Sequence, residues 1–245
     1  MRARSGATRL LETPALVLRR TPYGEADLVV SLFTKSSGRL SALARSARKS
    51  QKRFGGSLEP LHTLEVRLDE RPESDLLSLR DARLVTLRPG LLQDLSRLEA
   101  AGRYLSWVRQ AAPERKPEPA LWLLCEGCLD ELNENAAPAQ PEAPSATLTL
   151  ASYGLGLLVV SGWKLELERC VQSGVICPEG KAAMIDPERG GLVSRAQGGA
   201  SISVSGAQRA RLIAAQRGAP GALLEADAEL ALGLVERCLT AHAGI

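Results

Sequence analysis

Apolar and polar residues alternate along the first third of the chain with the two-residue period of β-strands. The clearest case is 38–45, whose two faces carry Leu40, Ala42 and Ala44 on one side and Arg39, Ser41, Leu43 and Arg45 on the other. Turn residues separate five such segments, which predict strands at 13–20, 26–34, 38–45, 62–70 and 74–85. Five short strands in succession favour a closed barrel of the oligonucleotide-binding (OB) type.

The apolar period changes to that of an α-helix after Pro89 and Gly90. Apolar residues then recur every three or four positions, as at Leu91, Leu95 and Leu98. Segments of this kind predict helices at about 90–111, 119–134, 146–160, 205–217 and 221–242. The fold class is therefore α+β, with a five-stranded OB barrel followed by an α-helical domain.

This pattern divides the chain into a flexible N-terminus (1–12), an OB-fold domain (13–86) and an α-helical domain (87–245). Within the last, Pro and Ala dominate 135–145, which is typical of a linker or an exposed loop. Residues 168–204 are rich in Gly, Pro and Ser and show no regular period. We expect them to form a loop-rich insertion.

Charge is distributed unevenly along the chain. The net charge is only +3 over 245 residues, but residues 1–53 hold twelve Lys and Arg against three acids. The first segment therefore carries about +9 and the remainder about −6. Such an asymmetry suggests a polyanionic partner for the basic part of the chain.

The basic charge is densest between Arg45 and Arg53, with five cations in nine residues and no acid. In an OB barrel, the second and third strands and their flanking loops form the face that holds nucleic acid. This segment follows the third predicted strand, so it lies at the edge of that face. The candidate nucleic-acid contacts are Arg39, Arg45, Arg48, Lys49, Lys52 and Arg53.

Aromatic residues are scarce in the barrel segment, which contains only Tyr23, Phe33 and Phe54, and we expect Phe33 to face the core. Proteins that bind single strands by base stacking use several aromatic side chains. Affinity here should come mainly from phosphate neutralisation, with little sequence preference and a steep dependence on salt. Covering phosphates while leaving bases unobstructed suits a factor that anneals complementary strands.

Catalytic motifs are absent from the sequence. Its two histidines, His62 and His242, lie far apart, and no nucleophile elbow, phosphate-binding loop or dinucleotide fingerprint accompanies them. Cys125 and Cys128 have the spacing of a redox or metal motif but sit inside an apolar helix, where buried thiols pack as small hydrophobic groups. We therefore predict that the protein is not an enzyme.

Cysteine usage and hydropathy also bear on the compartment. The five cysteines show no regular disulfide spacing, no cleavable signal peptide is evident, and no stretch of 18 uninterrupted apolar residues exists. We expect a cytoplasmic, nucleoid-associated protein with no membrane partner.

Three motifs follow one another in the N-terminal third: "YGEADLVVSLFT" (23–34), "GRLSALARSARK" (38–49) and "RFGGSLEP" (53–60). In this order they resemble the N-terminal region of the bacterial RecO family of recombination mediators. Further along, the layout is also similar, with "GW" at 162–163, "ERC" at 168–170 and "GG" at 190–191.

The resemblance implies an OB barrel, a helical domain with a small zinc-finger-like insertion, and a role in recombinational repair. Such proteins bind single- and double-stranded DNA, anneal complementary strands, and act with RecR and single-strand-binding protein to help load RecA. DNA contact carries over to the six basic residues named above.

Zinc binding does not carry over. Many family members have four cysteines in the insertion, whereas this chain keeps Cys170 and has Ser173, Ser194 and Gln197 at the other apparent positions; Cys177 lies nearby. Because a structural zinc site needs four ligands, we expect a degenerate finger with no bound metal and no other cofactor.

Two other interpretations stay open from the sequence. The first is an RNA-associated OB-fold interaction module, which a competition between single-stranded DNA and RNA would distinguish. The second is a thiol or zinc enzyme that uses Cys125, Cys128 or Cys170, which elemental analysis would test.

Overall fold

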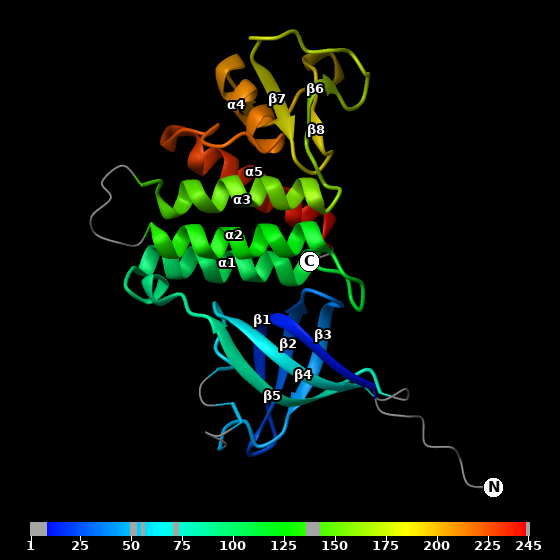
Figure 1. The fold of residues 1–245 in the computed structure, drawn as a ribbon. Coiled ribbons are helices and arrows are strands. Elements are labelled where there is room, and N and C mark those ends of the chain that lie inside the picture. The colour runs from blue at the N-terminus through cyan, green and yellow to red at the C-terminus, as the bar shows by residue number, and fades with distance from the viewer. Residues whose placement is uncertain (1–8, 50–52, 55–56, 71–73, 136–142, 244–245) are drawn as a thin grey trace, which may run out of the picture. The chain divides into compact units, whose positions relative to one another are not determined.

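The computed structural model describes residues 9–49, 53–54, 57–70, 74–135 and 143–243 (Figure 1). Contacts divide the chain into two compact units, Met1–Asn133 and Glu134–Ile245. The first unit contains the barrel strands and also helices α1 and α2, which the sequence analysis assigned to the second domain. The boundary proposed after residue 86 marks the end of the last barrel strand, and as a domain boundary it stays a prediction.

Five strands close into a barrel in the order β1-β2-β3-β5-β4, with β1 also paired to β4. They are β1 (Arg9–Tyr23), β2 (Asp27–Thr34), β3 (Gly38–Ala44), β4 (Thr63–Glu70) and β5 (Leu77–Thr86). All pairings are antiparallel except that of β3 with β5. This is an OB-fold barrel, as predicted. Strand β1 begins at Arg9, so residues 9–12 are strand rather than a flexible terminus, and residues 1–8 lie outside the described part.

The interior of the barrel is built from the alternate residues that the period predicted. Leu40, Ala42 and Ala44 of β3 are buried, as are Leu64, Val66 and Leu68 of β4. Their neighbours Ser41 and Arg67 are exposed. The two-residue period therefore located the inner face of β3 correctly, and β4 follows the same alternation.

Phe33 is fully buried but is not part of the barrel interior. Its ring packs against Trp122 of α2 (Pro119–Glu134), with the ring centroids 5.6 Å apart. Helix α1 (Leu95–Ala111) completes this unit and begins later than predicted, because a short 3₁₀ turn, η1 (Pro89–Leu92), precedes it. Asp94 caps α1 by accepting hydrogen bonds from the backbone N–H groups of Ser96 and Arg97.

A buried arginine joins the barrel to α2. The side chain of Arg88 is 1% exposed; Nε donates to Asp130 Oδ1 at 2.7 Å, and Nη1 donates to the Leu61 carbonyl and to Thr63 Oγ1 at 3.0 Å each. Thr63 Oγ1 in turn donates to Glu126 of α2 at 3.1 Å. These contacts explain why α2 belongs to the same compact unit as the barrel.

The second unit is built from helices and a small sheet (Figure 1). Its helices are α3 (Ala146–Val160), α4 (Gly206–Gln216) and α5 (Ala228–His242), the last preceded by the 3₁₀ turn η3 (Glu225–Asp227). The expected loop-rich insertion instead contains four short strands in the order β6-β8-β7-β9: β6 (Glu166–Cys170), β7 (Ala183–Asp186), β8 (Gly191–Leu192) and β9 (Ile202–Val204). A further 3₁₀ turn, η2 (Arg195–Gln197), follows β8.

Segment 136–142, most of the predicted linker, lies outside the described residues. Helix α2 ends at Glu134 and α3 begins at Ala146, as the sequence predicted. Within the part of the chain that is described, no helix combines the length and apolar character needed to span a bilayer.

Candidate nucleic-acid interface

The basic segment begins with a turn that is anchored to the neighbouring β1–β2 hairpin. The backbone N–H of Ser46 donates to Asp27 Oδ1 at 2.7 Å, and the N–H of Arg48 donates to the carbonyl of Ala26 at 3.0 Å. Ser46 adopts a left-handed conformation with φ of 56°, which turns the chain sharply after β3. The turn therefore holds its cations at a defined end of the barrel.

Arg45, Arg48 and Lys49 are all exposed at this end; we call these three residues the basic turn. The guanidinium of Arg48 donates to the backbone carbonyl of Glu25 at 3.2 Å, which orients the side chain without neutralising it. No ion pair of these three cations occurs among the described residues. Their charges are available to a polyanion.

Arg39 has a different environment from the basic turn. It pairs with Glu114 at 2.9 Å, and its Nε donates to the carbonyl of Ala112 at 3.2 Å. Backbone hydrogen bonds join Arg39 to the same loop, and Gly38 approaches it so closely that a Cβ would lie 2.0 Å from the Lys116 carbonyl oxygen. The structure thus uses Arg39 to bind the loop between α1 and α2, and DNA contact by Arg39 stays a prediction.

Arg53 is exposed, but its guanidinium donates to the carbonyls of Leu79 and Arg80 in β5 and lies 5.0 Å from the centroid of the Phe54 ring. These contacts hold the end of the basic segment against the barrel. Lys52, with the predicted turn at Gly55 and Gly56, lies outside the described residues. DNA contact by both cations stays a prediction.

The strand register places one more cation, Arg19, on the predicted nucleic-acid face, which the sequence analysis did not identify as a contact. Arg19 pairs with Ser31 of β2, which pairs with Ser41 of β3, so all three lie on the outer face of the barrel. Arg19 and Ser41 are exposed. A β-bulge between Val17 and Arg19 shifts this register. Because the bulge has no clear sequence signal, the spacing of cations alone could not place Arg19 on this face.

The histidines and the helical cysteines occupy structural positions. His62 Nδ1 accepts a hydrogen bond from the backbone N–H of Arg88 at 3.2 Å, and burial lowers its pKa. His242 is exposed in the last turn of α5. Cys125 and Cys128 are fully buried in α2, and burial raises the pKa of both thiols well above the ordinary value. A thiol held protonated in this way is a poor nucleophile.

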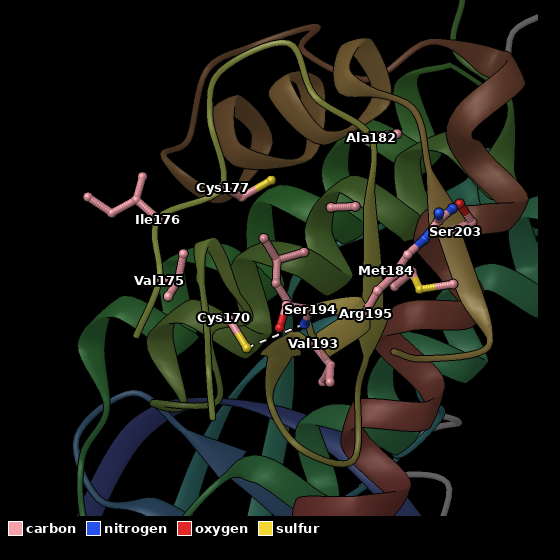
Figure 2. Close-up of a pocket in the computed structure, with 12 residues that line it drawn as sticks. Cys170, Val175, Ile176, Cys177, Ala182, Met184, Val193, Ser194, Arg195 and Ser203 are labelled. Carbon is pink, nitrogen blue, oxygen red and sulfur yellow. Dashed lines mark hydrogen bonds between the residues drawn. The ribbon is translucent and has the colours of Figure 1, made fainter. Parts of the chain in front are cut away.

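The candidate zinc ligands of the insertion are its two cysteines, Cys170 and Cys177. Figure 2 shows the thiols of Cys170 and Cys177 pointing in different directions, and the Cys170 sulfur accepts a hydrogen bond from the backbone N–H of Ser194 at 3.3 Å. The described residues contain no group of three or more Cys, His, Asp or Glu that could hold a metal ion. Hydroxyl and amide side chains at Ser173 and Gln197 are poor substitutes for thiolates at a structural zinc site.

An arginine organises this insertion. Arg209 of α4 is 4% exposed and donates to the carbonyls of Leu167, Cys177 and Pro178. One guanidinium thus satisfies three carbonyls from two segments of the insertion. Such a cross-link offers a physical reason why the loops can fold without a metal ion.

The thiol of Cys170 is expected to react with iodoacetamide at pH 7 faster than the thiols of Cys125, Cys128 and Cys238. Cys170 is only 4% exposed, but unlike the other three it borders a cavity of about 290 Å³, through which a small reagent can approach its sulfur (Figure 2). Hydrogen bonds from the Ser173 hydroxyl and the Ser194 N–H lower its pKa to about 6, so the reactive thiolate predominates above that pH. Peptide mass spectrometry of samples labelled between pH 5 and 8 measures this reactivity.

The Cys170→Ser variant is the control, and it should lose only the early label. Elemental analysis of the same preparation should find less than stoichiometric zinc. One zinc per chain, with Cys170 protected from labelling until a chelator is added, would contradict the degenerate-finger prediction.

Comparison with known proteins covers both units. Residues 9–88 match the family model "Recombination protein O N terminal", and residues 92–245 match "Recombination protein O C terminal". A protein of Anaeromyxobacter sp. (strain Fw109-5) named DNA repair protein RecO is 36% identical over 187 residues, which cover 76% of this chain and 70% of the relative. One of the same name from Pelobacter propionicus is 31% identical over 234 residues, 94% and 90% of the two chains. The chain therefore belongs to the RecO family of DNA repair proteins.

Proposed function

We propose that this protein is a non-enzymatic DNA-binding mediator of recombinational repair, which anneals complementary single strands. The observation that carries the proposal is the basic turn, whose cations Arg45, Arg48 and Lys49 are exposed at the end of β3 and have no acidic partner among the described residues. A protein that neutralises phosphates releases condensed counterions and gains affinity for any sequence. Membership of a family of DNA repair proteins supports DNA as the polyanion.

The scarcity of exposed aromatic rings explains why binding of this kind favours annealing. Phe33 and Phe54 are buried, so the barrel cannot stack a series of bases. Bound strands then keep their base edges accessible, while neutralised phosphates repel a second strand less. The two properties together lower the barrier to pairing.

The partners that we propose follow from the family. The protein would act with RecR and single-strand-binding protein to help load RecA onto single-stranded DNA, and it would do so in the cytoplasm, associated with the nucleoid. It would bind both single- and double-stranded DNA, because phosphates are common to both.

An annealing assay with two complementary fluorescent oligonucleotides tests the proposal. The wild-type protein should accelerate pairing at 0.05 M salt, with and without the cognate single-strand-binding protein, and should lose this activity steeply as salt rises. Failure to accelerate pairing under either condition would refute the annealing role. A clear preference for single-stranded RNA in competition with DNA of equal length would favour an RNA-associated module instead.

A further inference from the structure

The outer face of β1, β2 and β3 presents three rows of side chains that the strand register aligns. Arg19, Ser31 and Ser41 form the first row, and Thr21, Val29 and Leu43 form the second. In the third row, Tyr23 of β1 pairs with Asp27 of β2. Ala44 of β3 pairs with Leu28 of β2, so the next residue, Arg45, continues this row at the end of β3. Cations therefore stand at two corners of this face, and Tyr23 stands at a third.

Tyr23 is the exposed aromatic ring among the described residues of the barrel, with 59% of its surface accessible, whereas Phe33 is 0% exposed and Phe54 is 3% exposed. An exposed aromatic ring on the face of an OB barrel offers a flat apolar surface. Val29 and Leu43 in the neighbouring row are partly buried, so they extend this apolar surface between the cations.

The basic turn is fixed to the β1–β2 hairpin that carries this ring. Arg48 donates to the carbonyl of Glu25, two residues after Tyr23, and the carboxylate of Asp27 accepts from the N–H of Ser46. The Asp27 carboxylate, which lies opposite Tyr23 in the strand register, thus anchors the turn that carries Arg45 and Arg48 to the hairpin that carries the ring. A nucleotide can then place its phosphate on a cation and its base on the ring.

We propose that Tyr23 stacks against one unpaired base and thereby makes this face prefer single-stranded to duplex DNA. The inference rests on the proposed function and adds a specificity-determining residue to it. In a duplex, each base face is covered by its neighbours, so the ring gains a stacking surface only from a strand whose bases are unpaired. A single stacked base leaves the rest of the strand able to pair, which annealing requires.

Binding measured with three probes of equal length tests this inference: a single strand, the same strand with abasic sites in place of its bases, and the duplex. The Tyr23→Ala variant should bind the ordinary single strand at least about fivefold more weakly than the wild type, because an aromatic stack contributes a factor of this size or more. It should bind the abasic strand and the duplex like the wild type. The Tyr23→Phe variant keeps the ring and should keep the wild-type affinity for all three probes.

Two results would overturn the inference. Equal weakening toward all three probes would mean that the ring acts on the fold or on the phosphates, and unchanged binding of the ordinary strand would mean that no base stacks there. Either result leaves salt-dependent binding by the wild type intact, whereas the absence of any DNA binding by the wild type would refute the proposed function as well. Thermal unfolding of Tyr23→Ala should match the wild type, since the side chain is exposed.

Discussion

The triple variant Arg45→Glu/Arg48→Glu/Lys49→Glu is expected to lose strand annealing and to bind single-stranded DNA roughly 100-fold more weakly than the wild type at 0.1 M salt. Each phosphate contact on a single strand contributes about 0.7 to the slope of log affinity against log salt concentration. Loss of three contacts should therefore reduce that slope by about 2. Fluorescence anisotropy between 0.05 and 0.3 M salt measures both the affinity and the slope.

The matched control reverses three exposed cations of the second unit, in the variant Lys164→Glu/Lys181→Glu/Arg237→Glu. It changes the net charge by the same amount, so any effect of overall charge appears in both variants. Annealing and the salt slope should stay near the wild-type values in the control. Equal losses in the two variants, or wild-type binding by the first, would exclude the basic turn as the DNA contact. Lys52, which the sequence also indicates, can be added as a fourth reversal.

Segments with a strong and uninterrupted period were predictable from the sequence. Helices α2 and α3 have the predicted bounds, Pro119–Glu134 and Ala146–Val160, and β3 buries the predicted face. In each case local spacing and the burial of one face agree, so the tertiary structure does not override the local preference.

The small sheet of the second unit was not predictable in this way. Strand β8 has two residues and β9 has three, which are too short for any period to be recognised. The sheet depends on partners distant in sequence, such as Arg209, which binds the carbonyl of Leu167 at 3.3 Å. Non-local hydrogen bonds of this kind leave no pattern in a single sequence.

The sequence predicted where the basic turn of the candidate site lies. It did not predict which of the basic side chains are exposed and which are paired with an acid. Arg39 and Arg45 were predicted on the same face of one strand. Arg39 nevertheless forms an ion pair with Glu114, 75 residues further along the sequence, whereas Arg45 is exposed. Phe33 was expected to face the core and is fully buried, but its ring packs against Trp122 of α2 rather than inside the barrel. In both cases the side chain is covered by a helix or a loop from another part of the sequence, which the alternation within the strand cannot reveal. Sequence period locates a face, and only packing decides which part of that face stays exposed.

The Arg88→Met variant is expected to lower the free energy of unfolding by about 3 kcal/mol, because it removes a buried arginine that hydrogen-bonds to the Leu61 carbonyl, to Thr63 and to the half-exposed Asp130. The change leaves the Leu61 carbonyl and Thr63 Oγ1 without the donor they share, and each unsatisfied buried acceptor costs about 1–3 kcal/mol. Asp130, whose side chain is 48% exposed, can be solvated by water, so the loss should fall at the lower end of the range for broken buried pairs.

Thermal unfolding followed by circular dichroism measures this loss, which for a chain of this size corresponds to a fall in Tm of about 6–12 °C. The matched control is Arg67→Met, which removes a surface pair with Glu12 whose side chains are 54% and 48% exposed, and which should cost about 1 kcal/mol or less. If the two variants unfold at the same temperature, Arg88 does not hold α2 to the barrel. If Arg88→Met alone is destabilised while its DNA affinity below the transition matches the wild type, the arginine acts on the fold of the first unit and the basic turn binds DNA independently of it.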